Sequence, residues 1–99
     1  MQRIKEYADE MLEELCGAKK YAEKYLLFKV NGDNTWASRY REMANDEIKH
    51  ATWLHELSTI EIDKLRTIYT PPVDMQEKWD KSHARFVEKL AWIKQMLDM

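Results

Sequence analysis

Cysteine, glycine and proline are scarce in this chain. Its 99 residues include one cysteine, two glycines and two prolines. A single cysteine, Cys16, cannot form an internal disulfide, a rubredoxin-type iron site or an iron–sulfur cluster. So few glycines and prolines argue against the many tight turns of a β-sandwich or a β-barrel. The composition therefore favours long helices with solvated outer faces.

The chain also lacks a strong charge imbalance and a long apolar run. Its formal net charge of −2 offers no basic surface for nucleic acid. No apolar stretch approaches the length that crosses a membrane, and residues 2–6 are polar, unlike a secretion signal. We therefore expect a cytoplasmic protein with neither nucleic acid nor membrane as a partner.

Apolar residues at steps of three and four predict three helices. The first covers about residues 3–29, the second starts near Thr35 and reaches Ile68, and the third covers residues 74–99. Gly32 lies in the first turn and suits a helix C-cap, and residues 70–72, Thr-Pro-Pro, must end the second helix. Three long helices expose much side surface, so we expect oligomerisation.

Polar residues mark the expected helix starts. Residues 33–35 offer three N-cap candidates for the second helix. Ser-Thr-Ile-Glu at 58–61 is a capping-box pattern that predicts a kink or restart, and Asp-Met-Gln-Glu at 74–77 predicts the start of the third helix. We expect one all-α domain, 1–99, with an antiparallel hairpin over 1–69 and a C-terminal helix over 74–99. The alternative is a hairpin whose third helix packs on a neighbouring chain.

Three polar side chains interrupt the apolar stripes of the predicted hairpin. Glu14 lies on the first stripe, and Glu47 and His50 form a Glu-x-x-His on the second. The apolar members are Ile4, Tyr7, Met11, Ala18, Tyr21, Tyr25 and Phe28 on the first helix, Trp36, Tyr40, Met43, Leu54 and Leu57 on the second, and Met75, Trp79, Phe86, Leu90, Ile93 and Leu97, with His83, on the third.

The hairpin spacing predicts a metal site. Glu14 and Glu47 lie about seventeen and sixteen residues from the middle of the turn, so at ~1.5 Å rise per residue they reach one level. A buried carboxylate is costly unless it is paired or bound to metal. Two carboxylates and the His50 imidazole suit iron or manganese, and zinc can also bind. The alternative is a buried Glu47–His50 pair with Glu14 exposed.

Residues 40–54 carry a resemblance to a known family. Their sequence, Tyr-Arg-Glu-Met-Ala-Asn-Asp-Glu-Ile-Lys-His-Ala-Thr-Trp-Leu, resembles the second helix of the rubrerythrin branch of the ferritin-like superfamily. Glu14, followed by Tyr21, resembles the first-helix ligand and its nearby tyrosine, so the likeness covers about residues 7–57. It implies that Glu14 is a terminal or shifting iron ligand, Glu47 a bridging ligand and His50 a terminal nitrogen ligand, with Tyr21 close behind them.

The chain departs from this family in two ways. A complete four-helix member has a second Glu and a second Glu-x-x-His, and rubrerythrins usually add a rubredoxin-like cysteine domain; this chain has neither. It is therefore more similar to one-hairpin ferritin-like proteins, including encapsulated ferritins, whose sites assemble between two chains. The resemblance implies a di-iron centre in a homodimer or higher homo-oligomer and a four-helix bundle completed by dimerisation. It also makes an enclosing protein shell a candidate partner.

The expected function is oxidation of Fe(II) by O₂ or peroxide, with Glu14, Glu47 and His50 as the catalytic and metal-binding residues. The alternative is a metal-free helical interaction module with an internal Glu–His pair. On the third helix, Asp80 and His83 offer a way to complete a site within one chain, although a packed, hydrogen-bonded His83 with an exposed Asp80 is the favoured interpretation. We expect His55 to be solvated or at an interface, and Cys16 to be a small buried residue.

Overall fold

The fold consists of three helices running back and forth along one long axis. The structure is a computed structural model that describes residues 2–68 and 70–99. For Gln2 it describes the backbone alone. These residues form α1 (Gln2–Val30), α2 (Asn34–Ile68) and α3 (Val73–Leu97) and contain no strand. The all-α prediction is therefore confirmed for this part of the chain. Met1 and Tyr69, the two ends of the predicted hairpin, lie outside the described residues.

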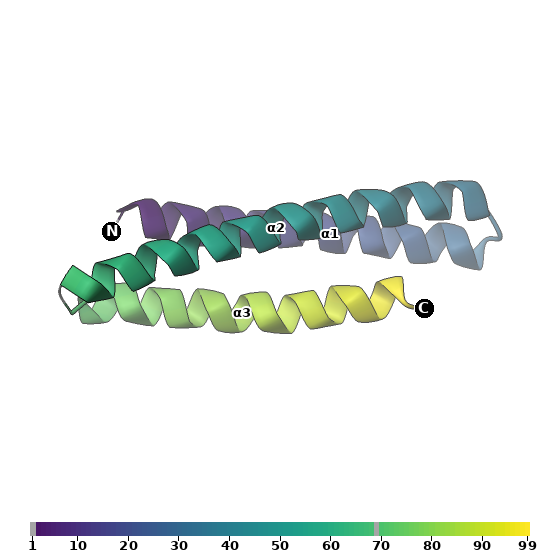
Figure 1. Cartoon of the computed structure of the whole chain (residues 1–99). Helices are drawn as coiled ribbons and strands as arrows, with labels where there is room; N and C mark the ends of the chain where they lie inside the picture. The colour runs from purple at the N-terminus through teal and green to yellow at the C-terminus, as the bar shows by residue number, and fades with distance from the viewer. Residues whose placement is uncertain (1, 69) are drawn as a thin grey trace.

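The three helices form an elongated rod. α2 runs antiparallel to α1, and α3 turns back and runs beside them in the direction of α1 (Figure 1). The molecule measures 55 × 17 × 17 Å. Among the described residues, no helix has an apolar stretch long enough to cross a membrane.

Gly32 and Asp33 explain the conformation of the turn between α1 and α2. Gly32 has φ 79°, a left-handed conformation that glycine adopts without steric cost. The amide of Asp33 donates to the carbonyl of Phe28 at 2.9 Å, as in a Schellman motif. The Asp33 carboxylate in turn accepts from the amide of Trp36 at 3.1 Å. Of the three N-cap candidates, Asp33 is thus the one that caps α2.

Neither capping-box pattern caps a helix in the structure. α2 continues without a restart through residues 58–61, where the Ser58 and Thr59 hydroxyls donate to the carbonyls of Leu54 and His55 within the helix. α3 begins after Pro72, which makes no side-chain cap hydrogen bond, and Asp74 lies in the first turn instead of capping it. In both places the polar side chains lie inside a helix. A capping-box pattern alone does not distinguish a residue that caps a helix from one that lies within it.

The core uses a face of each hairpin helix that is rotated from the predicted stripe. In α1 the residues Ile4, Met11, Ala18 and Tyr25 are buried as predicted, but their buried companions are Ala8, Leu15 and Ala22. In α2 the buried residues are Ala37, Ala44, Ile48, Ala51, Ser58 and Ile62, and none of them belongs to the predicted stripe. The alanines allow α1 and α2 to lie close together. The α2 face that carries Glu47 and His50 therefore lies at the edge of the core.

The third helix covers the hairpin mainly along α1. Most of the contacts of α3 are with α1, and few are with α2. Its buried residues Met75, Trp79, Phe86, Ile93 and Leu97 match the predicted stripe, whereas Ser82 is buried in place of His83. Because α3 takes up the Leu15 side of α1, the side with Glu14 stays free of it.

Candidate metal centre

Glu14 on α1 and the Glu47–His50 pair on α2 converge at one level of the hairpin. One ligand atom from each residue lies within 4.8 Å of the other two. The Nδ1 atom of His50 is 3.6 Å from Glu14 Oε2 and 3.8 Å from Glu47 Oε1. The antiparallel turn sets the level, and the three-residue spacing of Glu47 and His50 puts both on one side of α2. The structure thus brings together the three side chains predicted from the sequence.

The group is half-open to solvent. The side chains of Glu14, Glu47 and His50 are 32%, 27% and 46% exposed. Glu14 lies as close to His50 as Glu47 does, so the arrangement differs from a buried Glu47–His50 pair with Glu14 turned out to solvent. An ion can reach these ligand atoms from outside without unfolding the hairpin.

The Glu14 carboxylate raises the pKa of its neighbour Glu47. Hydrogen bonding to Glu14 raises the pKa of Glu47, and partial burial and the negative charge of Glu14 act in the same direction. The charge of His50 acts in the opposite direction and does not cancel the rise in the pKa of Glu47. Two neighbouring carboxylates repel each other when both are ionised, and a cation bound between them would relieve that repulsion. The donor set of two carboxylates and one imidazole fits iron, manganese or zinc.

Gly17 provides the space that the Glu47 carboxylate occupies. It lies on α1 one turn after Glu14, and a Cβ atom added to it would lie 3.1 Å from Glu47 Oε2. Gly17 is not among the site residues predicted from the sequence. Its signal was a glycine inside a predicted helix, which costs helix stability and therefore suggests a close approach at that position.

Aromatic side chains line the hairpin on both sides of the group. Toward the turn, the ring of Tyr40 lies 6.1 Å from that of Tyr21 and stacks at 5.5 Å on that of Phe28. On the other side, the ring of Trp53 is 6.0 Å from the His50 imidazole. Tyr21 is half-buried beside Tyr40. Within the described residues, no hydrogen bond links Tyr21 to Glu14, Glu47 or His50. Its predicted place behind the ligands stays a prediction.

The other candidate residues lie elsewhere. His83 is exposed and hydrogen-bonded to His55, whose half-buried ring lies between α2 and α3 and is thus at an interface within the chain. Asp80 is exposed and accepts from Gln76. Cys16 is exposed, so the prediction of a small buried residue is wrong: it lies one position beyond the buried Leu15, on the outer side of α1.

Comparisons with known proteins add no relative. No protein-family model, curated protein or solved structure matches the chain. Membership of the ferritin-like superfamily therefore stays a prediction carried by the resemblance over residues 7–57.

Proposed function

We propose that this chain is a ferritin-like di-iron carboxylate protein that oxidises Fe(II) with O₂ or peroxide at a site shared between two copies. The observation that carries the proposal is the convergence of Glu14, Glu47 and His50 within 4.8 Å on a half-exposed face. Of the metals that fit the donor set, iron is the one that supports redox chemistry with these oxidants in the related family.

Two copies are needed because one chain supplies half of the donor set. A di-iron site of this type uses four carboxylates and two histidines. One chain contributes two carboxylates and one histidine, and a two-fold axis doubles that number without any new residue. The resulting pair of hairpins would form a four-helix bundle, with each α3 outside it on the far side of α1.

The face around the site supports the pairing. Trp36, Trp53 and Leu57 of α2 are 46%, 58% and 37% exposed and flank the Glu47–His50 level on both sides. Between them Tyr40, Met43 and Leu54 are half-buried. A long strip of apolar side chains with charged ligands at its middle is costly to leave in water, and a second copy would cover it.

The residues have distinct tasks in the proposed reaction. The two carboxylates bind the cations and neutralise their changing charge, and His50 adds a nitrogen ligand. The raised pKa of Glu47 means that a proton competes with the cation for this carboxylate more strongly than at an ordinary glutamate. Two Fe(II) substrates lose one electron each, and O₂ accepts both with two protons to leave as hydrogen peroxide. Because the 99 residues have one cysteine and thus no rubredoxin-type site, we favour iron oxidation over peroxidase turnover with a reductant.

A metal-free interaction module is the second candidate. The exposed Trp36 and Trp53 favour it, because amphipathic helices bind partner helices through such anchors. In that case Glu14, Glu47 and His50 would be a polar contact with no redox role. An enclosing protein shell belongs to the first proposal through the family resemblance alone, whereas the expected cytoplasmic location comes from the sequence features given above.

Iron loading and oxidation kinetics distinguish the two candidates. After anaerobic addition of Fe(II), we expect about two irons per dimer, and on exposure to air we expect oxidation faster than in buffer. Glu14→Ala and His50→Ala should each slow it strongly, since each change acts twice in a symmetric site. Glu13→Ala, an exposed carboxylate next to Glu14, is the matched control and should keep the wild-type rate. Wild-type oxidation no faster than buffer would reject the ferroxidase and leave the interaction module.

A further inference from the structure

His55 and His83 form a pair that the proposed iron site does not use. His55 Nε2 on α2 lies 2.8 Å from His83 Nδ1 on α3. The His55 ring stacks on Phe86 with centroids 4.4 Å apart and an interplanar angle of 9°, and Trp79 lies 5.7 Å away. His55 lies five positions after His50, which turns it about 140° around α2 from the Glu14–Glu47–His50 group. The pair is therefore a separate feature of the fold.

The spacing of the two ring nitrogens matches a chelating pair. A metal–imidazole bond of about 2.0 Å and a nitrogen–metal–nitrogen angle of about 90–109° put two such nitrogens about 2.8–3.3 Å apart. The observed 2.8 Å lies at the lower end of that range. At present one ring nitrogen must donate a proton to the other. For a cation to bind both nitrogens, the donating ring must change tautomer and carry its hydrogen on its other nitrogen, while the accepting ring already does so.

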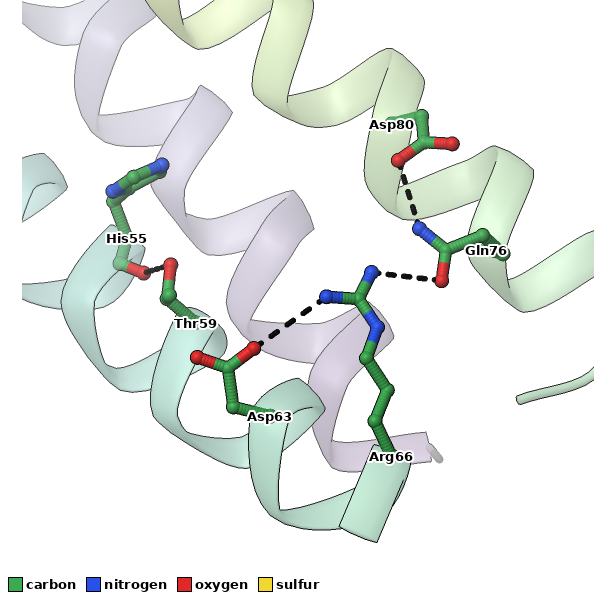
Figure 2. A network of polar contacts seen from close by, with 6 residues as sticks. All are labelled: His55, Thr59, Asp63, Arg66, Gln76 and Asp80. Atoms are coloured by element: carbon green, nitrogen blue, oxygen red, sulfur yellow. Dashed lines mark hydrogen bonds and ion pairs between the residues drawn. The ribbon is translucent and has the colours of Figure 1, made fainter. Parts of the chain in front are cut away.

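Burial and protonation also suit a cation. Burial lowers the pKa of His55, and the charge of His83 acts in the same direction. The charge of Glu56 opposes them without cancelling the decrease, so the His55 ring is neutral at neutral pH. Packing against Phe86 and Trp79 holds that ring in place, while His83 is exposed and leaves an open side for water ligands. Asp80, three residues before His83 on α3, accepts from Gln76, which in turn accepts from Arg66 (Figure 2). Among the described residues no carboxylate lies close enough to both rings to form a group of three ligands, so the donor set is imidazole without carboxylate.

We propose that His55 and His83 bind a divalent transition-metal ion that prefers imidazole, such as Zn(II), Ni(II) or Cu(II), with water completing its coordination. Imidazole ligands suit these cations, whereas Mn(II) prefers carboxylate oxygens. The bound cation would join α2 to α3, two helices that share few other contacts. The site would then fasten the third helix to the hairpin, independently of iron chemistry at Glu14, Glu47 and His50.

Zn(II) binding to a variant without the first site tests the proposal. Glu47→Ala removes a ligand of the carboxylate group and leaves the histidine pair intact. We expect this variant to bind Zn(II) at one ion per chain by equilibrium dialysis and to bind Mn(II) at least tenfold more weakly. The imidazole ¹⁵N resonances of His55 and His83 should shift with Zn(II). Adding His83→Gln, an exposed position where the fold should tolerate the change, should weaken Zn(II) binding at least tenfold.

A carboxylate control and the iron assay complete the test. Asp80→Asn in the Glu47→Ala background should keep Zn(II) affinity, because the Asp80 carboxylate is engaged by Gln76. Zn(II) binding that survives His83→Gln, or ¹⁵N resonances of both histidines that do not move, would overturn the proposal. So would loss of affinity in Asp80→Asn, which would contradict the imidazole donor set. The proposed Fe(II) oxidation has its own test in His50→Ala, so either proposal can fail alone.

Discussion

Glu47 is the residue whose surroundings say most about the site. It lies between the Glu14 carboxylate, the His50 ring and the open backbone of Gly17. A carboxylate in such a place is unfavourable in the empty protein and favourable once a cation is bound. Stability without metal and affinity for metal should therefore change in opposite directions when this residue is altered.

The raised pKa of Glu47 predicts how stability depends on pH. Because its folded pKa lies above the ordinary 4.5, protonated Glu47 contributes stability below about pH 4.5, and this contribution is lost as pH rises through the folded pKa. Glu47→Gln keeps the shape and removes the titration. In metal-free urea unfolding, we expect the variant to match the wild type near pH 4 and to be more stable than it at pH 7. If the free energies of unfolding of the variant and the wild type differed by the same amount at both pH values, the raised pKa of Glu47 would be contradicted.

Gly17→Ala should separate stability from metal binding. Alanine inside a helix stabilises it by about 0.5–1 kcal/mol relative to glycine. The new Cβ, 3.1 Å from Glu47 Oε2, must push the carboxylate away by a few tenths of an ångström. We expect a higher melting temperature without metal and a smaller rise on adding Mn(II). In a Glu47→Ala background, Gly17→Ala should change only the melting temperature measured without metal. If Gly17→Ala alone left the Mn(II)-dependent rise in melting temperature unchanged, the space between residue 17 and Glu47 would be unimportant for metal binding.

At the scale of elements, the turn between α1 and α2 brings the ligands to one level. It depends on the positive φ of Gly32 and on the Asp33 side chain, which caps α2. A turn of different length would shift α2 along α1 and separate Glu14 from Glu47 by about 1.5 Å for each residue of slip.

Changes in this turn should weaken the fold and leave the ligands intact. Gly32→Ala forces a non-glycine residue into a left-handed conformation, and we expect a loss of about 1 kcal/mol in the free energy of unfolding. Asp33→Ala removes the cap and should cost about 1 kcal/mol as well. Urea unfolding measures both, with Asn31→Ala, an exposed turn residue, as control. No loss in either variant would mean that the turn does not depend on these two residues.

At the scale of the whole molecule, exposed tryptophans mark two different regions of the described chain. One is the site face of α2 with Trp36, Trp53 and Leu57, and the other contains Trp92, which lines a hollow between α1 and α3 with Leu15 and Ile93. Only the first carries the Glu14–Glu47–His50 group, so the proposed dimer should depend on it alone.

A charged residue on each face tests the proposed dimer. Trp53→Glu places a carboxylate in the apolar strip and should convert the dimer to a folded monomer, because Trp53 is already 58% exposed in the single chain. Fe(II) oxidation should fall with it. Trp92→Glu, at a comparably exposed tryptophan, should remain a dimer. Sedimentation velocity and circular dichroism measure the two effects. A Trp53→Glu protein that is still dimeric would place the interface elsewhere.

The sequence by itself determined the helices, the turn and the coincidence of the ligands. Scarce glycine and proline, the three- and four-residue spacing and the position of Gly32 suffice for three helices and one tight reversal. Equal distances from that turn put Glu14 and Glu47 at one depth, because rise per residue is nearly constant in any α-helix. These features are local or depend on simple counting, so no knowledge of packing was needed.

Only the tertiary structure decided which faces are buried. Two adjacent stripes of α2 are both plausible cores, and the alanine-rich one is buried because small side chains let α1 approach closely. The same packing decided that Gly17 makes room for Glu47, that α2 runs unbroken past Ser58, and that His55 meets His83. Each depends on how helices are rotated against one another. Periodicity constrains that rotation only to within one residue, whereas side-chain volume in three dimensions determines it.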